Sequence, residues 1–223
     1  MTGQLIFDLP LNQGWQRDAF LVTPATTAAL AAVEGWKTWA DKRLLLVGPY
    51  GSGKTHLAHI WAEMAQALWI DPADLHARLD DIAPEACVIL DDAQRVTGRA
   101  EEALFHLYNR LAPHGRLLLT APAAPRDWGL ALPDLLSRLQ AMPTARLEPP
   151  DDDLLAGVLV KLFADRQITA EARLIPYLLP RMERSIAAAQ ALVAALDARS
   201  LATHRPVTRA LAAEVLDSAA PAR

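Results

Sequence analysis

A glycine-rich stretch between an apolar run and a helix-like segment constrains this chain more than any other feature. The apolar run Arg43–Val47 (RLLLV) is short, which is typical of a buried parallel strand. It is followed by a segment that fits G-x-x-x-x-G-K-[ST] at every fixed position, Gly48-Pro49-Tyr50-Gly51-Ser52-Gly53-Lys54-Thr55. Glycines let backbone N–H groups face phosphate oxygens, and a helix N-terminus adds a favourable dipole. The sequence therefore predicts a phosphate-binding loop, and the alternative is a glycine-rich turn that binds nothing.

Two acidic residues follow another buried run, Cys87–Leu90 (CVIL), and complete the expected site. In such a site Lys54 reaches the β- and γ-phosphates, and the Thr55 hydroxyl binds Mg²⁺. Asp91 would hold the same ion, directly or through water, and Asp92 would orient the attacking water. The alternative is that the two acids only cap the next loop.

Strand-like and helix-like segments alternate over the first two thirds of the chain. Strands are expected at 43–47, 67–70, 87–90, 116–120 and 145–147, with helices at 23–40, 54–67, 101–111 and 132–139. This order predicts an α/β fold, a parallel five-stranded sheet between helices. After Pro150 only helices are expected, at about 151–166, 171–181, 185–202 and 207–217, with Asp151 as the first N-cap. We expect three parts: an arm (1–14), a nucleotide-binding α/β domain (15–148) and a helical lid subdomain (151–223).

Composition excludes several classes of protein. The 223 residues contain 22 Lys and Arg against 26 Asp and Glu, which gives a net charge of −4. This charge argues against nucleic-acid binding through an overall positive charge. It does not exclude a local basic patch. The single cysteine excludes an internal disulfide and a cysteine metal cluster. No signal peptide and no run of about 18 apolar residues is present, so we expect a cytoplasmic protein without a membrane partner.

Four segments carry a resemblance to a known family. Gly51–Leu57 resembles the G-x-G-K-T-H-L loop of the DnaA-like branch of AAA+ ATPases, and Val88–Asp92 resembles its second acidic motif. The stretches 107–110 (LYNR) and 132–139 (LPDLLSRL) resemble the Hda group of DnaA-related regulators. The resemblance covers about 15–217 and is specific only in the first 140 residues. It implies an AAA+ P-loop core that binds ATP or ADP with Mg²⁺, with His56 and Thr120 among the nucleotide contacts.

The first residues resemble a short docking peptide. Gln4-Leu5-Ile6-Phe7-Asp8-Leu9 fits Q-L-x-[LF]-x-L, similar to the peptide by which Hda-type regulators bind the DNA polymerase sliding clamp. Leu5, Phe7 and Leu9 would enter an apolar groove while Gln4 makes orienting hydrogen bonds. The alternative is that the arm adds an edge strand to its own domain. A DnaA-type helix-turn-helix domain has no room after the lid, so we expect no direct sequence-specific DNA binding.

Arg138, in a Ser-Arg context, matches the arginine finger of this family. Such an arginine stabilises charge on the γ-phosphate bound by a neighbouring subunit. The alternative is a salt bridge to Asp134, four residues earlier on the same helix. The partners that the resemblance implies are DnaA and the sliding clamp, and the sequence leaves homo-oligomerisation open.

Two positions depart from the family pattern. Ala121-Pro122 replaces a polar pair and leaves only Thr120 to sense phosphate. The nucleotide-sensing arginine of the lid would fall near Ala187 or Ala188, and Arg184 is about one helical turn early. We therefore expect nucleotide binding, with intrinsic ATP hydrolysis weak or absent.

The resemblance as a whole implies a bacterial regulator of replication initiation. It would dock on the sliding clamp and stimulate ATP hydrolysis by DnaA through Arg138 acting in trans. Two alternatives stay open: a DNA-associated loader or adaptor ATPase of the helicase-loader type, and a nucleotide-bound scaffold without a catalytic role.

Overall fold

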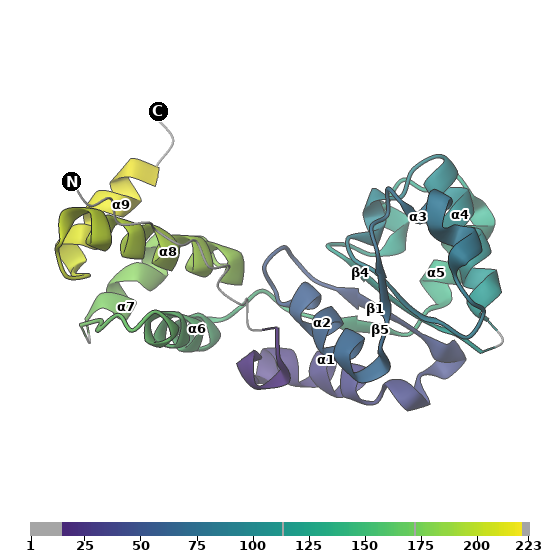
Figure 1. Cartoon of the computed structure of the whole chain (residues 1–223), viewed down its shortest axis with the longest axis horizontal. Helices are drawn as coiled ribbons and strands as arrows, with labels where there is room; N and C mark the ends of the chain where they lie inside the picture. Colours follow the sequence, from purple (N-terminus) through teal and green to yellow (C-terminus); the bar gives the residue numbers. More distant parts are fainter. Residues whose placement is uncertain (1–14, 113, 172, 220–223) are drawn as a thin grey trace, which may run out of the picture.

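The computed structural model describes residues 15–112, 114–171 and 173–219, which form two lobes (Figure 1). An α/β lobe and a helical lobe lie at opposite ends of an elongated molecule, joined by the extended stretch between β5 and α6. The strands are β1 (Arg43–Val47), β2 (Leu68–Ile70), β3 (Cys87–Leu90), β4 (Arg116–Ala121) and β5 (Thr144–Arg146). The helices are α1 (Pro24–Glu34), α2 (Lys54–Ala65), α3 (Leu75–Arg78), α4 (Arg99–Leu111), α5 (Pro133–Ala141), α6 (Asp152–Asp165), α7 (Leu174–Leu178), α8 (Ile186–Thr203) and α9 (Arg209–Ala219).

The five strands form one sheet in the order β2-β3-β4-β1-β5, and every neighbouring pair is parallel. This confirms the predicted parallel five-stranded sheet. Because all strands run the same way, their carboxyl ends meet at one edge of the sheet. The loop after β1, the acids after β3 and the end of β4 are therefore neighbours in space.

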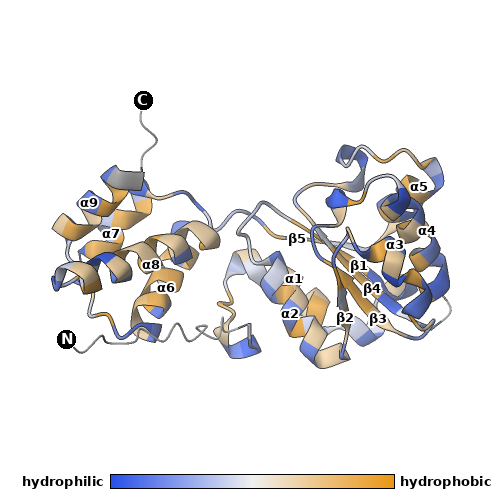
Figure 2. Ribbon diagram, turned by 45° about the horizontal axis from the view of Figure 1, so that its top comes forward, coloured by the Kyte–Doolittle hydropathy of each residue, from blue (hydrophilic) through white to orange (hydrophobic). Residues whose placement is uncertain are grey.

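Each face of the sheet is covered by helices. Leu45 and Val47 pack with the apolar residues of α4 and α5, whereas Leu44 and Leu46 pack with α1 and α2. This alternation along β1 follows from the two-residue period of a strand. Figure 2 shows the central strands of the sheet in hydrophobic colours, whereas hydrophobic and hydrophilic residues alternate along the helices.

The predicted helix at 23–40 is wrong in its second half. Helix α1 starts with a capping box between Thr23 and Thr26 and stops before Gly35. The chain then makes short 3₁₀ turns, and the Trp39 indole donates to the Ala32 carbonyl at 2.6 Å, which folds this segment back onto α1. Helix α3 was not predicted, because four residues are too few to show helical periodicity.

The helical lobe has an apolar core of its own, which includes Leu159, Phe163, Leu178, Val193 and Leu211. The predicted cap is confirmed, since the Asp151 carboxylate accepts a hydrogen bond from the Leu154 amide at 2.7 Å. The expected helix at 171–181 is divided into α7 and the 3₁₀ turn η7 (Leu179–Arg181), where Pro180 has no N–H to continue the helix. In the part of the chain that the structure describes, no helix has the length and apolarity needed to span a bilayer.

Candidate nucleotide site

The loop between β1 and α2 has a backbone shape that requires its glycines. Gly51 and Gly53 adopt φ values of +72° and +100°, which L side chains rarely adopt. A Cβ atom at Gly48 would lie 2.5 Å from the Leu147 carbonyl oxygen. Within residues 15–112, 114–171 and 173–219, the buried Ser52 hydroxyl finds no hydrogen-bond partner. Such a cradle, with an unsatisfied hydroxyl inside it, fits a phosphate group.

Lys54 begins α2 and is folded over this loop. Its side chain is only 5% exposed, and its ammonium donates to the carbonyls of Gly48 at 2.7 Å and Pro49 at 2.8 Å. Burial lowers the pKa of Lys54, and the charges of Asp92 and Asp91 act in the opposite direction. A cation therefore lies where β- and γ-phosphates would be held.

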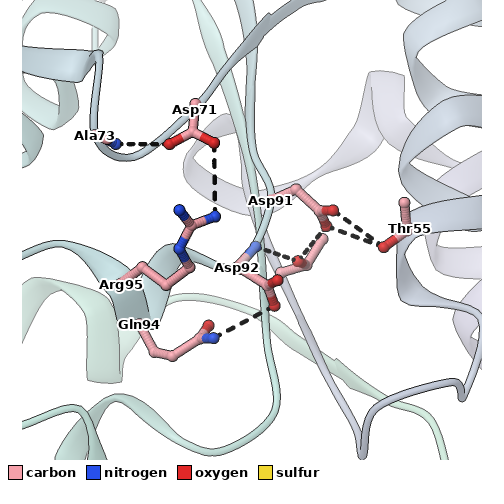
Figure 3. A network of polar contacts seen from close by, with 8 residues as sticks. Thr55, Asp71, Ala73, Asp91, Asp92, Gln94 and Arg95 are labelled. Atoms are coloured by element: carbon pink, nitrogen blue, oxygen red, sulfur yellow. Dashed lines mark hydrogen bonds and ion pairs between the residues drawn. The ribbon is translucent and has the colours of Figure 1, made fainter.

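A hydroxyl–carboxylate network joins three elements beside the loop (Figure 3). The Thr55 hydroxyl donates to Asp91 Oδ2 at 3.0 Å, and the Thr120 hydroxyl donates to Asp91 Oδ1 at 2.6 Å. The Asp92 amide in turn donates to the Thr120 hydroxyl at 3.0 Å. The structure thus brings together Thr55 from α2, Asp91 from the end of β3 and Thr120 from β4. Carboxylate and hydroxyl oxygens are hard ligands of the kind that Mg²⁺ prefers, so this donor set fits the ion.

Asp92 and Gln94 connect the acidic loop to the tip of the phosphate loop. Asp92 has left-handed backbone angles (φ 54°, ψ 47°), and its carboxylate accepts from the Gln94 amide at 3.3 Å. The same Gln94 amide donates to the Tyr50 hydroxyl at 3.3 Å. Tyr50 is 65% exposed, and its ring centroid lies 5.6 Å from the Lys54 ammonium. Gln94 was missed in the sequence because no motif marks its position.

The helical lobe contacts the phosphate loop directly, which the sequence did not reveal. The Ile186 amide donates to the Gly51 carbonyl at 3.0 Å, and a Cβ at Gly51 would lie 2.6 Å from Ser185 Cβ. Ser185 also caps α8, accepting a hydrogen bond from the Ala188 amide at 3.0 Å. The first turn of α8 therefore packs on the loop through backbone and small side chains.

Arg184 does not take the place of the nucleotide-sensing arginine that the resemblance implies. Its guanidinium pairs with the Asp152 carboxylate of α6 at 3.0 Å, and both side chains are largely exposed. The side chains that follow on α8, Ala187 and Ala188, carry no charge. The helical lobe thus presents no cation from this turn to the phosphate loop.

His56 contacts the segment that precedes α1. Its Nε2 lies 3.1 Å from the Gln16 carbonyl, and its ring meets Trp15 and Phe20 edge-on at 5.4 Å and 5.1 Å between centroids. Burial is the largest cause of the lowered pKa of His56, which favours a neutral ring whose Nε2–H donates to Gln16. Phe20 also approaches Gly53, whose Cβ position is 3.4 Å from the ring. The predicted contact between His56 and a nucleotide stays a prediction.

Arg138 is exposed on α5. Its guanidinium lies over the rings of Phe105 and Tyr108, at 5.1 Å and 5.6 Å from their centroids. No ion pair joins Arg138 to Asp134 or to another carboxylate among the described residues, so the salt-bridge alternative is wrong. The docking motif with Gln4, Leu5, Phe7 and Leu9 lies outside the described residues.

Comparisons with known proteins place the fold. No family model matches the sequence. The structure is similar to domain III of the replication initiation protein DnaA from Thermotoga maritima, with a TM-score of 0.80, 20% identity, and coverage of 94% of this chain and 98% of that chain. The fold is that of the AAA+ P-loop ATPases. This confirms the predicted fold class, in which the parallel α/β sheet followed from the alternating elements and the AAA+ type from the resemblance.

Other solved structures share the AAA+ fold. AMPPCP-bound DnaA from Aquifex aeolicus matches with a TM-score of 0.70 and 18% identity over 82% of this chain and 64% of that chain. A point mutant of RuvB from Thermotoga maritima matches with a TM-score of 0.67 and 18% identity over 87% of this chain and 68% of that chain. This chain therefore corresponds to about two thirds of each of these two proteins.

Proposed function

We propose that this protein binds ATP or ADP with Mg²⁺ and regulates replication initiation together with DnaA. The phosphate cradle, the Lys54 ammonium and the Thr55–Asp91 pair support nucleotide binding. In this proposal the segment from Gln4 to Leu9 docks on the sliding clamp, and Arg138 enters the nucleotide site of ATP-bound DnaA. The guanidinium stabilises charge that develops on the γ-phosphate during hydrolysis there.

The proposal rests on the position of the Arg138 guanidinium, which lies over two aromatic rings. Two ring faces hold it in place, and no carboxylate among the described residues neutralises it. A guanidinium over an aromatic face keeps its N–H edge open, which suits bidentate binding of a phosphate. An exposed, pre-positioned cation of this kind is what a trans-acting finger requires.

The chain's own site supports retention of a nucleotide more than its turnover. Ala121-Pro122 follows Thr120 where the resembled family has a polar pair, and the uncharged Ala187 and Ala188 lie in the first turn of α8, which contacts the loop. Arg184 is engaged with Asp152. In the proposal this protein presents Arg138 to DnaA while its own bound nucleotide stabilises the fold.

The deciding experiment measures ATP hydrolysis by DnaA in the presence of DNA-loaded clamp. We expect wild-type protein to stimulate it, and Arg138→Ala to lower the stimulation at least about 100-fold, because arginine fingers contribute on the order of 10³-fold or more. Arg126→Ala is the matched control, since Arg126 is an exposed arginine of the same lobe that lies near Asp127 at 3.6 Å. Equal stimulation by Arg138→Ala and wild type would rule the mechanism out.

The clamp contact is tested separately. Gln4→Ala combined with Leu5→Ala should weaken binding to the isolated clamp by about 10-fold or more, because interface anchors typically contribute at least 1–2 kcal/mol each. Unaltered clamp affinity would assign the arm another role and leave the Arg138 proposal standing.

A second candidate function is a nucleotide-bound scaffold, favoured by the uncharged first turn of α8 on the phosphate loop. Wild-type protein that binds DnaA and the clamp but leaves DnaA hydrolysis unchanged would support this candidate.

A further inference from the structure

The seven arginines that the structure describes in the helical lobe, between residues 151 and 219, fall into two groups. Four form ion pairs with carboxylates: Arg166 with Asp197, Arg184 with Asp152, and Arg199 and Arg205 with Glu214. The other three, Arg173, Arg181 and Arg209, are exposed and have no carboxylate partner within the described part of the lobe. The unpaired arginines belong to α7, η7 and α9 or border them.

Two of the unpaired arginines converge on one tyrosine. The guanidinium groups of Arg181 and Arg209 lie 4.1 Å and 4.7 Å from the centroid of the Tyr177 ring. Arg181 also donates to the Tyr177 backbone carbonyl at 3.0 Å. Arg173, the third unpaired arginine, is the N-cap residue of α7. We call Tyr177, Arg181 and Arg209 the Tyr177 cluster.

The Tyr177 cluster holds like charges together without neutralising them. An aromatic ring attracts a cation but carries no net charge of its own. The two guanidinium groups are also held in place by the ring, so less conformational freedom is lost when they bind an anion. The surface is therefore prepared for a ligand that carries several negative charges.

The surroundings of the cluster favour a polyanion over an acidic protein surface. A stable protein–protein interface needs buried apolar or aromatic anchors in addition to charges. The large hydrophobic side chains that the described helical lobe exposes are Val160 of α6 and Leu201 of α8, and neither belongs to α7, η7 or α9. A nucleic-acid backbone needs no such anchor, because its affinity comes from the release of counterions when arginines neutralise phosphates.

We propose that the Tyr177 cluster binds the phosphodiester backbone of nucleic acid without reading its sequence. In this proposal the guanidinium groups of Arg181 and Arg209 contact phosphate oxygens. The Tyr177 ring does not stack on bases, because the same guanidinium groups lie over it. With so few contacts, binding is weak, with a dissociation constant on the order of 10⁻⁵ M at physiological salt. The proposal is independent of Arg138 and of the clamp-docking arm, and it agrees with a net charge of −4 because the patch is local.

The test is fluorescence anisotropy of labelled DNA over a salt series, with DnaA and clamp absent. Binding is measured both to a DNA duplex and to a DNA single strand of arbitrary sequence, which shows which of the two forms of nucleic acid the cluster binds. We expect the double variant Arg181→Ala/Arg209→Ala to lose about 10-fold in affinity at low salt, and the slope of log K against log salt to become shallower by about 2. The matched control is Arg199→Ala/Arg205→Ala, which removes the same net charge from arginines that are paired with Glu214.

Three results would overturn the proposal. The first is unchanged affinity and slope in Arg181→Ala/Arg209→Ala, and the second is an equal loss in the control, which would indicate a general charge effect. The third is binding of a labelled polyglutamate peptide with no binding of either DNA, which would indicate an acidic protein partner. Arg181→Lys/Arg209→Lys keeps both charges and should retain most of the salt slope, so the test remains decisive if the alanine variant fails to fold.

Discussion

The phosphate loop has two neighbours, and they differ in what they offer it. On the sheet side, Thr55, Asp91 and Thr120 form a complete polar network at hydrogen-bond distances. On the side of the helical lobe, the contact is a backbone hydrogen bond from Ile186 to Gly51. The sheet side carries groups suited to a nucleotide and a metal ion, whereas the first turn of α8 contributes packing and no charge. This difference agrees with the proposal that the protein retains a nucleotide more than it hydrolyses one.

The largest expected effect concerns the cation of the loop itself. Lys54→Ala should lower ADP affinity at least about 100-fold, because charge-assisted hydrogen bonds to phosphate are lost from a mostly buried site. Lys37→Ala is the control, since Lys37 is exposed and lies near the Trp36 ring. Titration with a fluorescent ADP analogue measures both. An ADP affinity of Lys54→Ala equal to that of the wild type would show that the Lys54 ammonium does not hold the phosphates.

The contact with the helical lobe is tested by a glycine pair. Gly51→Ala should lower the free energy of unfolding by about 2 kcal/mol or more, because it adds a clash with Ser185 to the strain of a positive φ. Gly129 has nearly the same φ, +71°, with no atom within 4 Å of its Cβ position, so Gly129→Ala should cost only about 1 kcal/mol. Chemical denaturation measures the difference, and equal costs would argue that the lobes do not touch at Gly51 in solution.

The Asp91→Asn variant tests whether the carboxylate on the sheet side of the loop binds Mg²⁺. The amide keeps the shape of the carboxylate but loses its charge, so Mg²⁺ should no longer strengthen nucleotide binding. We expect affinity in the presence of Mg²⁺ to fall by about 10-fold and affinity in EDTA to change little, since a hydrogen bond to a charged group contributes about 1.5–3 kcal/mol. A variant that still responds to Mg²⁺ would place the metal ligand elsewhere.

The smallest expected effect is a pH dependence of stability. It comes from His56 of α2, which contacts the segment before α1. Burial is the largest cause of the lowered pKa of His56; the charges of His59 and Lys161 act in the same direction, and the hydrogen bond to Gln16 opposes them. The unfolded chain therefore binds a proton more readily, so stability is full above about pH 6.5 and falls as the pH drops below that value. His56→Gln should flatten the decline in melting temperature between pH 7 and pH 5.5. The same decline in both proteins would contradict this assignment.

The strands and the phosphate loop were predictable because their signals are local. Buried parallel strands are continuous apolar runs, as in 43–47 and 87–90, and the loop is fixed by its own residue types. The end of α1 was missed because the helical pattern of apolar residues continues past Gly35 to Trp39, whose contact with Ala32 turns the chain back. Packing within the fold therefore outweighed periodicity there.

The part of the site that could not be predicted depends on contacts between distant segments. The bond from Ile186 to Gly51 is made by backbone atoms, which any residue could supply, so no side-chain pattern announces it. Gln94 reaches Tyr50 across 44 residues of sequence. The pairing of Arg181 with Arg209 on one ring likewise requires α7 and α9 to be packed together.

The tryptophans of the chain are unevenly divided between the lobes. All six lie between Trp15 and Trp128, and the helical lobe contains none. Tryptophan emission therefore follows the unfolding of the α/β lobe alone, whereas far-ultraviolet circular dichroism follows the helices of both. The separation between the two melting curves of unlabelled protein is thus a direct optical measure of how cooperatively the lobes unfold.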